Sequence, residues 1–190
     1  MEPVALPPDA IHQLEALSCD LGLPDFDLLL VGDGSGTVYH QPAGWACVAY
    51  DRRRQQLTLH RGGITCGTNN LAELFPYVQA LWHHHQEHRQ VPAAPVGVQV
   101  VSDSELTVRC GNGRYARRAN GCLWASVGWF EQNGYQIAWR HVPRNSNAWS
   151  ALMDSLAGQA RRLVLEGLPD LPANGIKSKS PAVAGEAGRN

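Results

Sequence analysis

Four acidic residues stand out in this chain of 190 residues, because each is embedded in apolar sequence rather than in a charged stretch. Asp33 and Asp103 each end an apolar run expected to be a strand, Glu73 falls in the first turn of an expected helix, and Asp154 lies inside the last expected helix. Buried carboxylates repel one another, and such a set persists when a divalent cation neutralises it. Carboxylates bind Mg²⁺, and two such ions about 4 Å apart can activate a water and stabilise the leaving oxygen of a phosphodiester. The four acids together predict this metal-dependent chemistry, whereas any one of them alone would more simply be a turn former or a helix cap.

The elements that must position these acids follow a mixed α/β pattern. Expected strands cover residues 27–32, 44–50, 56–63, 96–101 and 135–142, and expected helices cover residues 69–88, 104–110, 121–132 and 147–165. A three-strand meander followed by crossover units predicts a mixed five-stranded sheet, with three antiparallel strands and then parallel additions, flanked by helices. Pro76 should strain or kink the first long helix, because proline lacks the backbone donor.

Length and composition limit the class of protein. Apolar residues make up 44% of the chain and charged residues 17%, which is typical of one globular domain. We expect an N-terminal extension with a short helix over residues 1–27, one domain over 28–166, and a disordered tail rich in Pro and Gly over 167–190. No run approaches about 18 apolar residues, so we expect no membrane partner. The five cysteines include no C-x-x-C pair, which favours a cytoplasmic protein without a disulfide scaffold.

The charge pattern is more informative than the total. A formal net charge of −1 argues against a strongly electrostatic nucleic-acid binder. No acid stands between Glu105 and Glu131, however, while several arginines do: Arg109, Arg114, Arg117 and Arg118. The sequence therefore leaves open whether a basic face lies beside an acidic site.

The segments around the four acids resemble motifs of the ribonuclease H family. They are residues 30–35 (LVGDGS), 68–74 (TNNLAEL), 102–104 (SDS) and 153–157 (MDSLA). Their order and spacing are similar to those of the family, and they cover residues 28–165. The resemblance implies the ribonuclease H-like fold in a monomer whose partner is an RNA–DNA hybrid.

The resemblance also implies an activity and its residues. The activity would be endonucleolytic hydrolysis of the RNA strand of the hybrid, leaving 5′-phosphate and 3′-hydroxyl ends. Asp33, Glu73, Asp103 and Asp154 match the catalytic ligands of two Mg²⁺ or Mn²⁺ ions. The matching substrate-binding positions are Gly34, Ser35, Thr68, Asn69 and Asn70 on the RNA strand, where the 2′-hydroxyl distinguishes RNA from DNA, and Arg114, Arg117, Arg118 and Arg144 on phosphates. Thr68 equally suits a helix cap, and Trp124 or Trp129 would stack on a base or pack in the core.

Three departures from the family leave alternatives open. The loop over residues 36–43 differs from the usual Gly- and Pro-rich loop. Asn147 stands seven residues before Asp154 rather than four, and an ungapped alignment would put Ala151 at the acid's place. We favour Asp154 because alanine cannot bind metal, with a displaced or weak fourth ligand as the alternative. Many members of the family carry a histidine in the loop before the final helix, whereas His141 lies earlier, at the end of an expected strand. His141 suits either an assisting catalytic role or a strand-end hydrogen bond.

A histidine cluster near the end of the first long helix could indicate a metal-binding site. His84 and His88 are four residues apart and could bind zinc, but no carboxylate or cysteine set completes a tetrahedron in the sequence. We therefore expect a solvated helix end.

Two other functions remain open for the chain as a whole. They are a nuclease of the same fold that acts on another nucleic acid, and a hybrid-binding module that has lost catalysis.

Overall fold

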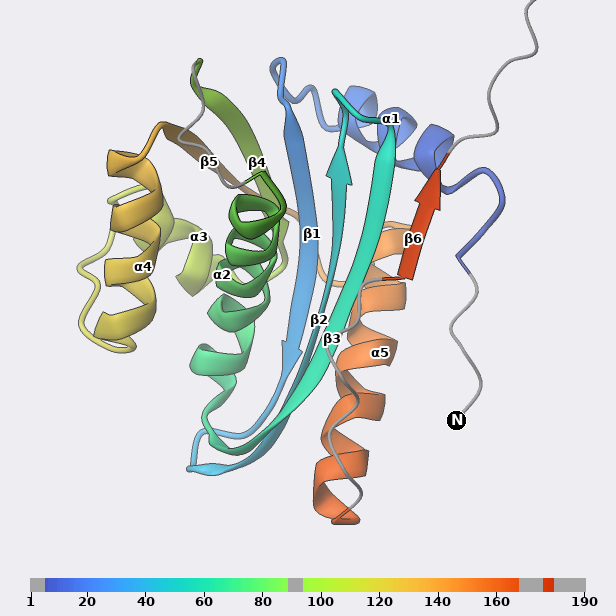
Figure 1. Ribbon diagram of the computed structural model, residues 1–190. Helices are drawn as coiled ribbons and strands as arrows, with labels where there is room; N and C mark the ends of the chain where they lie inside the picture. The colour runs from blue at the N-terminus through green and yellow to red at the C-terminus, as the bar shows by residue number, and fades with distance from the viewer. Residues whose placement is uncertain (1–5, 89–93, 168–175, 180–190) are drawn as a thin grey trace, which may run out of the picture.

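The protein is a twisted sheet between two layers of helices (Figure 1). A computed structural model describes residues 6–88, 94–167 and 176–179. The strands are β1 (Leu28–Ser35), β2 (Gln41–Asp51), β3 (Gln56–Gly67), β4 (Val96–Ser102), β5 (Tyr135–His141) and β6 (Ile176–Lys179), in the order β5-β4-β1-β2-β3-β6. β1, β2 and β3 pair antiparallel, while β4 lies parallel to both β1 and β5. This confirms the predicted mixed sheet of three antiparallel strands with parallel additions.

The sixth strand was not expected. β6 pairs antiparallel with β3 and lies within the segment that composition assigned to a disordered tail. The short segment carries no apolar alternation, so its pairing with an edge strand leaves little trace in the sequence. The rest of that tail, residues 168–175 and 180–190, lies outside the described residues.

Helices cover both faces of the sheet. α2 (Asn69–His88), α3 (Glu105–Gly111) and α4 (Gly121–Gln132) pack on one face, and α1 (Ala10–Asp20) and α5 (Ala148–Leu165) pack on the other (Figure 1). Each forms where the sequence predicts a helix, and α2 continues past the buried Pro76. Among the described residues, no helix is long and apolar enough to cross a bilayer.

β1 runs further than the sequence indicates. Its ladder with β2 continues through the pairs Asp33↔Ala46 and Ser35↔Gly44. Asp33 therefore lies inside the strand rather than at its end. The glycines on either side of Asp33 are typical of a turn, but the ladder with β2 runs past both of them and keeps them extended.

A glycine brings α2 onto β1. A Cβ atom on Gly34 would lie 2.3 Å from the carbonyl carbon of Ala72 and 2.4 Å from the backbone nitrogen of Glu73. Only a residue without a side chain allows this approach. The close contact places Glu73 over the strand that carries Asp33.

A tyrosine fixes the same region from the core. The hydroxyl of Tyr77 in α2 is fully buried and lies 2.7 Å from the carbonyl oxygen of Gly32 in β1 and 3.0 Å from that of Val101 in β4. It can donate its hydrogen to either carbonyl. α2 is thereby tied to the two strands that lead to Asp33 and Asp103.

We predict opposite effects for two glycine-to-alanine substitutions. Gly34→Ala should lower the free energy of unfolding by about 1–3 kcal/mol, because the added methyl group overlaps the backbone of α2. Gly128→Ala in α4 meets no atom within 4 Å and should raise it by about 0.5–1 kcal/mol through helix propensity. Urea unfolding of both variants tests this, and equal effects at the two sites would contradict the close packing of α2 on β1.

Candidate active site

Three of the four predicted acids meet near the carboxyl ends of the neighbouring interior strands β1 and β4. Asp33 comes from β1, Asp103 directly follows the neighbouring parallel strand β4, and Glu73 comes from α2. One carboxylate oxygen from each lies within 4.8 Å of the others. Asp33 and Glu73 are buried, and Asp103 is half-buried. Glu73 is the fifth residue of α2, so it opens the second turn rather than lying in the first as expected.

The pKa values of all three carboxyl groups are shifted in the same direction, upward. Burial, together with the charge of Asp103, raises the pKa of Asp33 to about 7. Burial, together with Asp33 and Asp103, raises the pKa of Glu73 to about 9, and burial also raises the pKa of Asp103. Without a cation, the cluster therefore retains protons at neutral pH that isolated carboxyl groups would lose.

The cluster fits a hard divalent cation. Within the part of the chain that the structure describes, the buried Oε2 atom of Glu73 has no hydrogen-bond donor, while Oε1 accepts one at 3.3 Å from Nδ2 of Asn69. Such a buried anionic oxygen is costly unless a proton or a cation neutralises it. Carboxylate oxygens alone suit Mg²⁺ or Mn²⁺ rather than a softer metal. Asp33, Glu73 and Asp103 are therefore the residues that would hold the ion.

The sequence matches no protein-family model and no curated protein. Solved structures do match. The N-terminal RNase H domain of a Mycobacterium tuberculosis protein is 21% identical, with 75% of this chain and 99% of that one covered and a TM-score of 0.61. LC11-RNase H1, isolated from compost by a metagenomic approach and solved in complex with an RNA/DNA hybrid, is 25% identical, with coverages of 73% and 99% and a TM-score of 0.60. RNase H1 of Halobacterium salinarum is 20% identical, with coverages of 70% and 96% and a TM-score of 0.52.

The chain has the ribonuclease H fold. The structural similarity confirms the fold that the motif resemblance implied. The three converging acids of this ribonuclease H-fold domain lie in the segments that carry the resemblance.

The fourth predicted acid stands apart from the other three. The carboxylate of Asp154 in α5 accepts a hydrogen bond from the guanidinium of Arg144, and its side chain is 33% exposed. Asp154 is nevertheless close enough for its charge to raise the pKa values of Asp33 and Asp103. The structure thus pairs the proposed fourth ligand with the proposed phosphate-binding arginine at the rim of the cluster.

The segment before Glu73 has structural roles as well as exposed groups. Thr68 Oγ1 accepts a hydrogen bond from the backbone nitrogen of Leu71 at 3.2 Å, which is the capping role that the sequence allowed. Asn69 Oδ1 accepts one from the backbone nitrogen of Gly36 at 3.1 Å, so this side chain links the loop after β1 to Glu73. Asn70 is exposed and Ser35 is half-buried, so both reach solvent beside the acids.

A groove is lined both by the start of α2 and by the arginine-rich stretch. Its volume is about 440 Å³. Its polar lining includes Asn70, Thr107, Arg114, Tyr115, Arg118 and Asn120. Two of the predicted phosphate-binding arginines therefore lie in the same groove as one of the predicted RNA-binding residues. The sequence could not show this, because residues 70 and 114–118 are far apart in the chain.

The third arginine of that stretch packs against the protein. Arg117 Nε donates a hydrogen bond to the carbonyl oxygen of Cys110 at 3.2 Å, and the guanidinium lies 4.5 Å from the centre of the Trp124 ring. Trp124 is buried and Trp129 stacks on Trp82, so both tryptophans have the packing role. Arg117 is thus engaged within the domain, unlike its neighbours in the groove.

Two further residues position the acids. His141 Nε2 lies 3.2 Å from the backbone oxygen of Asp103, which corresponds to the strand-end hydrogen bond considered for it. Sequence analysis missed Tyr77, which holds α2 to β1 and β4. Its position four residues after Glu73 on the same helix face was the available signal.

The carboxyl cluster predicts a pH-dependent cost in the metal-free protein. The pKa values of Asp33 and Glu73 are above their unfolded values, so the folded state keeps protons that the unfolded chain releases above about pH 4. This contribution to stability is present at low pH and is lost as the pH rises toward about 7 for Asp33 and about 9 for Glu73. Asp33→Asn removes one of the repelling charges and should raise the unfolding free energy at pH 8 in EDTA by about 1–3 kcal/mol.

Urea unfolding of the wild type and the variant between pH 5 and about pH 8 measures this difference. The exposed Asp20→Asn is the matched control and should leave the pH dependence unchanged. An Asp33→Asn variant that parallels the wild type at every pH would contradict a repulsive cluster.

Proposed function

We propose that this ribonuclease H-fold domain is a metal-dependent endoribonuclease that hydrolyses the RNA strand of RNA–DNA hybrids, leaving 5′-phosphate and 3′-hydroxyl ends. The observation that carries the proposal is the convergence of Asp33, Glu73 and Asp103 near the carboxyl ends of β1 and β4. The similarity to LC11-RNase H1, whose structure contains an RNA/DNA hybrid, supports the choice of substrate.

The acids and the adjacent Arg144 would have different roles, metal binding and phosphate binding. Asp33, Glu73 and Asp103 would hold Mg²⁺ or Mn²⁺, and two bound ions would supply Lewis-acid activation of water and charge stabilisation on the leaving oxygen. The Arg144 side chain is 68% exposed, so it can turn from Asp154 to the substrate phosphate. That exchange would free Asp154 to act as the fourth metal ligand.

The two strands of the hybrid would be held by different groups. Gly34, Ser35, Asn69 and Asn70 lie beside the acids, where 2′-hydroxyl recognition would select the RNA strand. Arg114 and Arg118 line the same groove as Asn70 and would bind phosphates of the other strand. The chain has a net charge of −1, so we expect modest affinity that falls with salt.

Cleavage of a labelled RNA–DNA hybrid in Mg²⁺ tests the assignment. Wild type should cut only the RNA strand, and Asp33→Asn should lower the rate by about 10³-fold or more while the variant still folds and binds the hybrid. Asp20→Asn should retain full activity, and EDTA should abolish cleavage in both. Full activity in Asp33→Asn would refute the metal-site assignment.

The same assay separates the other two functions. Preferential cleavage of duplex DNA, duplex RNA or single strands would indicate a nuclease of this fold with another substrate. Hybrid binding without turnover in Mg²⁺ and Mn²⁺ would indicate a binding module.

A second prediction concerns the groove. The double substitution Arg114→Ala and Arg118→Ala should raise KM for the hybrid by about three- to tenfold and reduce the slope of log affinity against log salt by about 1–2, with kcat little changed. Arg162→Ala in α5 removes an exposed arginine on the other face of the sheet and serves as the control. Salt-dependent binding and steady-state kinetics give both quantities. An unchanged KM and salt slope in the double variant would contradict binding of the hybrid in this groove.

A further inference from the structure

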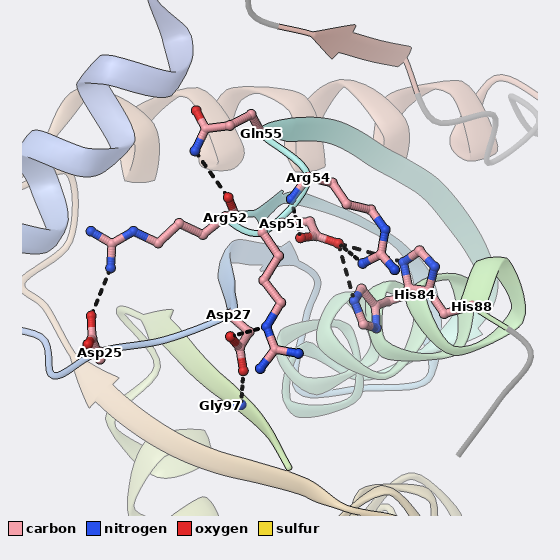
Figure 2. A network of polar contacts seen from close by, with 10 residues as sticks. Asp25, Asp27, Asp51, Arg52, Arg54, Gln55, His84, His88 and Gly97 are labelled. Atoms are coloured by element: carbon pink, nitrogen blue, oxygen red, sulfur yellow. Dashed lines mark hydrogen bonds and ion pairs between the residues drawn. The ribbon is translucent and has the colours of Figure 1, made fainter. Parts of the chain in front are cut away.

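A second cluster of possible metal ligands lies at the other end of α2 (Figure 2). It consists of Asp51, the last residue of β2, with His84 and His88 near the end of α2. The Nε2 atom of each histidine lies 3.6 Å from Oδ2 of Asp51, and one ligand atom from each of the three residues lies within 4.8 Å of the others. Asp51 thus adds the carboxylate ligand that the histidine spacing lacked in the sequence.

The cluster is enclosed and has room for an ion. The side chains of Asp51, His84 and His88 are 10%, 11% and 21% exposed. They line a cavity of about 20 Å³ beneath the β2–β3 hairpin. That volume is about what one water molecule or one small ion needs.

The spacing of the ligand atoms suits a tetrahedral ion. Zn²⁺ binds imidazole nitrogen and carboxylate oxygen at about 2.1 Å, so two ligand atoms on a tetrahedral ion are roughly 3.4 Å apart. The two nitrogen-to-oxygen distances of 3.6 Å are within a few tenths of an ångström of that value. Small side-chain movements would therefore complete the geometry.

One of the histidines already has the support that a ligating imidazole needs. His84 Nδ1 lies 3.1 Å from the hydroxyl of Tyr135 in β5. A histidine that binds metal through one ring nitrogen usually donates the other N–H to an oxygen, which fixes the tautomer and the ring plane. When Nδ1 donates to Tyr135, the lone pair of His84 Nε2 faces Asp51.

Arg54 competes for the same carboxylate (Figure 2). Its guanidinium donates to Asp51 Oδ2 at 2.6 Å, and its backbone nitrogen donates to Oδ1 at 3.0 Å. The Arg54 side chain is 47% exposed, so the guanidinium can move into solvent while the backbone contact to Oδ1 remains. An ion would take the place of the guanidinium on Oδ2.

We propose that Asp51, His84 and His88 form a Zn²⁺-binding site with a fourth position open to water. Two imidazoles with one carboxylate favour Zn²⁺ over Mg²⁺, in contrast to the carboxylate cluster at the start of α2. The histidines lie 11 and 15 residues beyond Glu73, which is roughly 16–22 Å along the helix. The bound ion therefore stabilises the contact between the end of α2 and the β2–β3 hairpin rather than taking part in phosphodiester hydrolysis.

Competition between the full-length protein and a chromophoric chelator for Zn²⁺, in excess Mg²⁺ to occupy the carboxylate cluster, tests the site. The wild type should bind one Zn²⁺ per chain, and His84→Gln and His88→Gln should each weaken binding by about 100-fold or more. Tyr135→Phe should weaken it by about tenfold, because the orienting hydrogen bond is lost. The exposed His40→Gln is the control and should bind as the wild type does.

Two further measurements distinguish a Zn²⁺ site from an ion-pair network of the same residues that binds no metal. Arg54→Gln should tighten Zn²⁺ binding by about fivefold, because the competing cation is removed. Zn²⁺ should raise the Tm of the wild type and of Asp33→Asn but not that of His88→Gln, since only the native state presents the ligands. Equal Zn²⁺ affinity in the wild type and both histidine variants, or loss of binding in Asp33→Asn alone, would overturn the proposal.

Discussion

Repulsion among three carboxylates, two of them buried and one half-buried, is the constraint on which the structure of the acidic cluster depends. One oxygen of each of Asp33, Glu73 and Asp103 lies within 4.8 Å of the others. Burial raises the pKa of all three, and the charges of neighbouring acids raise them further. The fold forces them together through Gly34, which lets α2 touch β1, and through Tyr77, which ties α2 to both strands. A protein that holds three such groups in place favours cation binding, because a bound cation removes the electrostatic repulsion among the carboxylates and the free energy released contributes to its affinity.

Arginine pairing recurs around both metal-ligand clusters. Arg144 pairs with Asp154 beside the three carboxylates, and Arg54 pairs with Asp51 beside the two histidines. In each case an exposed cation neutralises an acid that a metal could otherwise use. α2 connects the two places, with an oxygen-rich ligand set at its first turns and an imidazole set at its last. The two ligand sets differ in chemistry, so we expect the first to favour Mg²⁺ and the second to favour Zn²⁺.

Much of the fold could be predicted because apolar periodicity reflects burial. The helices and the first five strands form where the sequence indicates, and the three converging acids are among the four that are embedded in apolar sequence. The extension of β1 past Asp33 could not be predicted, since glycine-rich sequence looks like a turn until a partner strand pairs with it. The same holds for the engagement of Arg117 with Trp124, which depends on tertiary packing. The histidine cluster looked like a solvated helix end because its carboxylate, Asp51, comes from a distant strand.

The central claim is that Asp33, Glu73 and Asp103 form a divalent cation site. A crystal of the protein soaked in Mn²⁺ tests it directly, because anomalous scattering at the manganese edge locates the ion without reference to activity. We predict an anomalous peak bonded to carboxylate oxygens of all three residues. The absence of a peak among them, in a crystal where Mn²⁺ is bound elsewhere on the chain, would contradict the account.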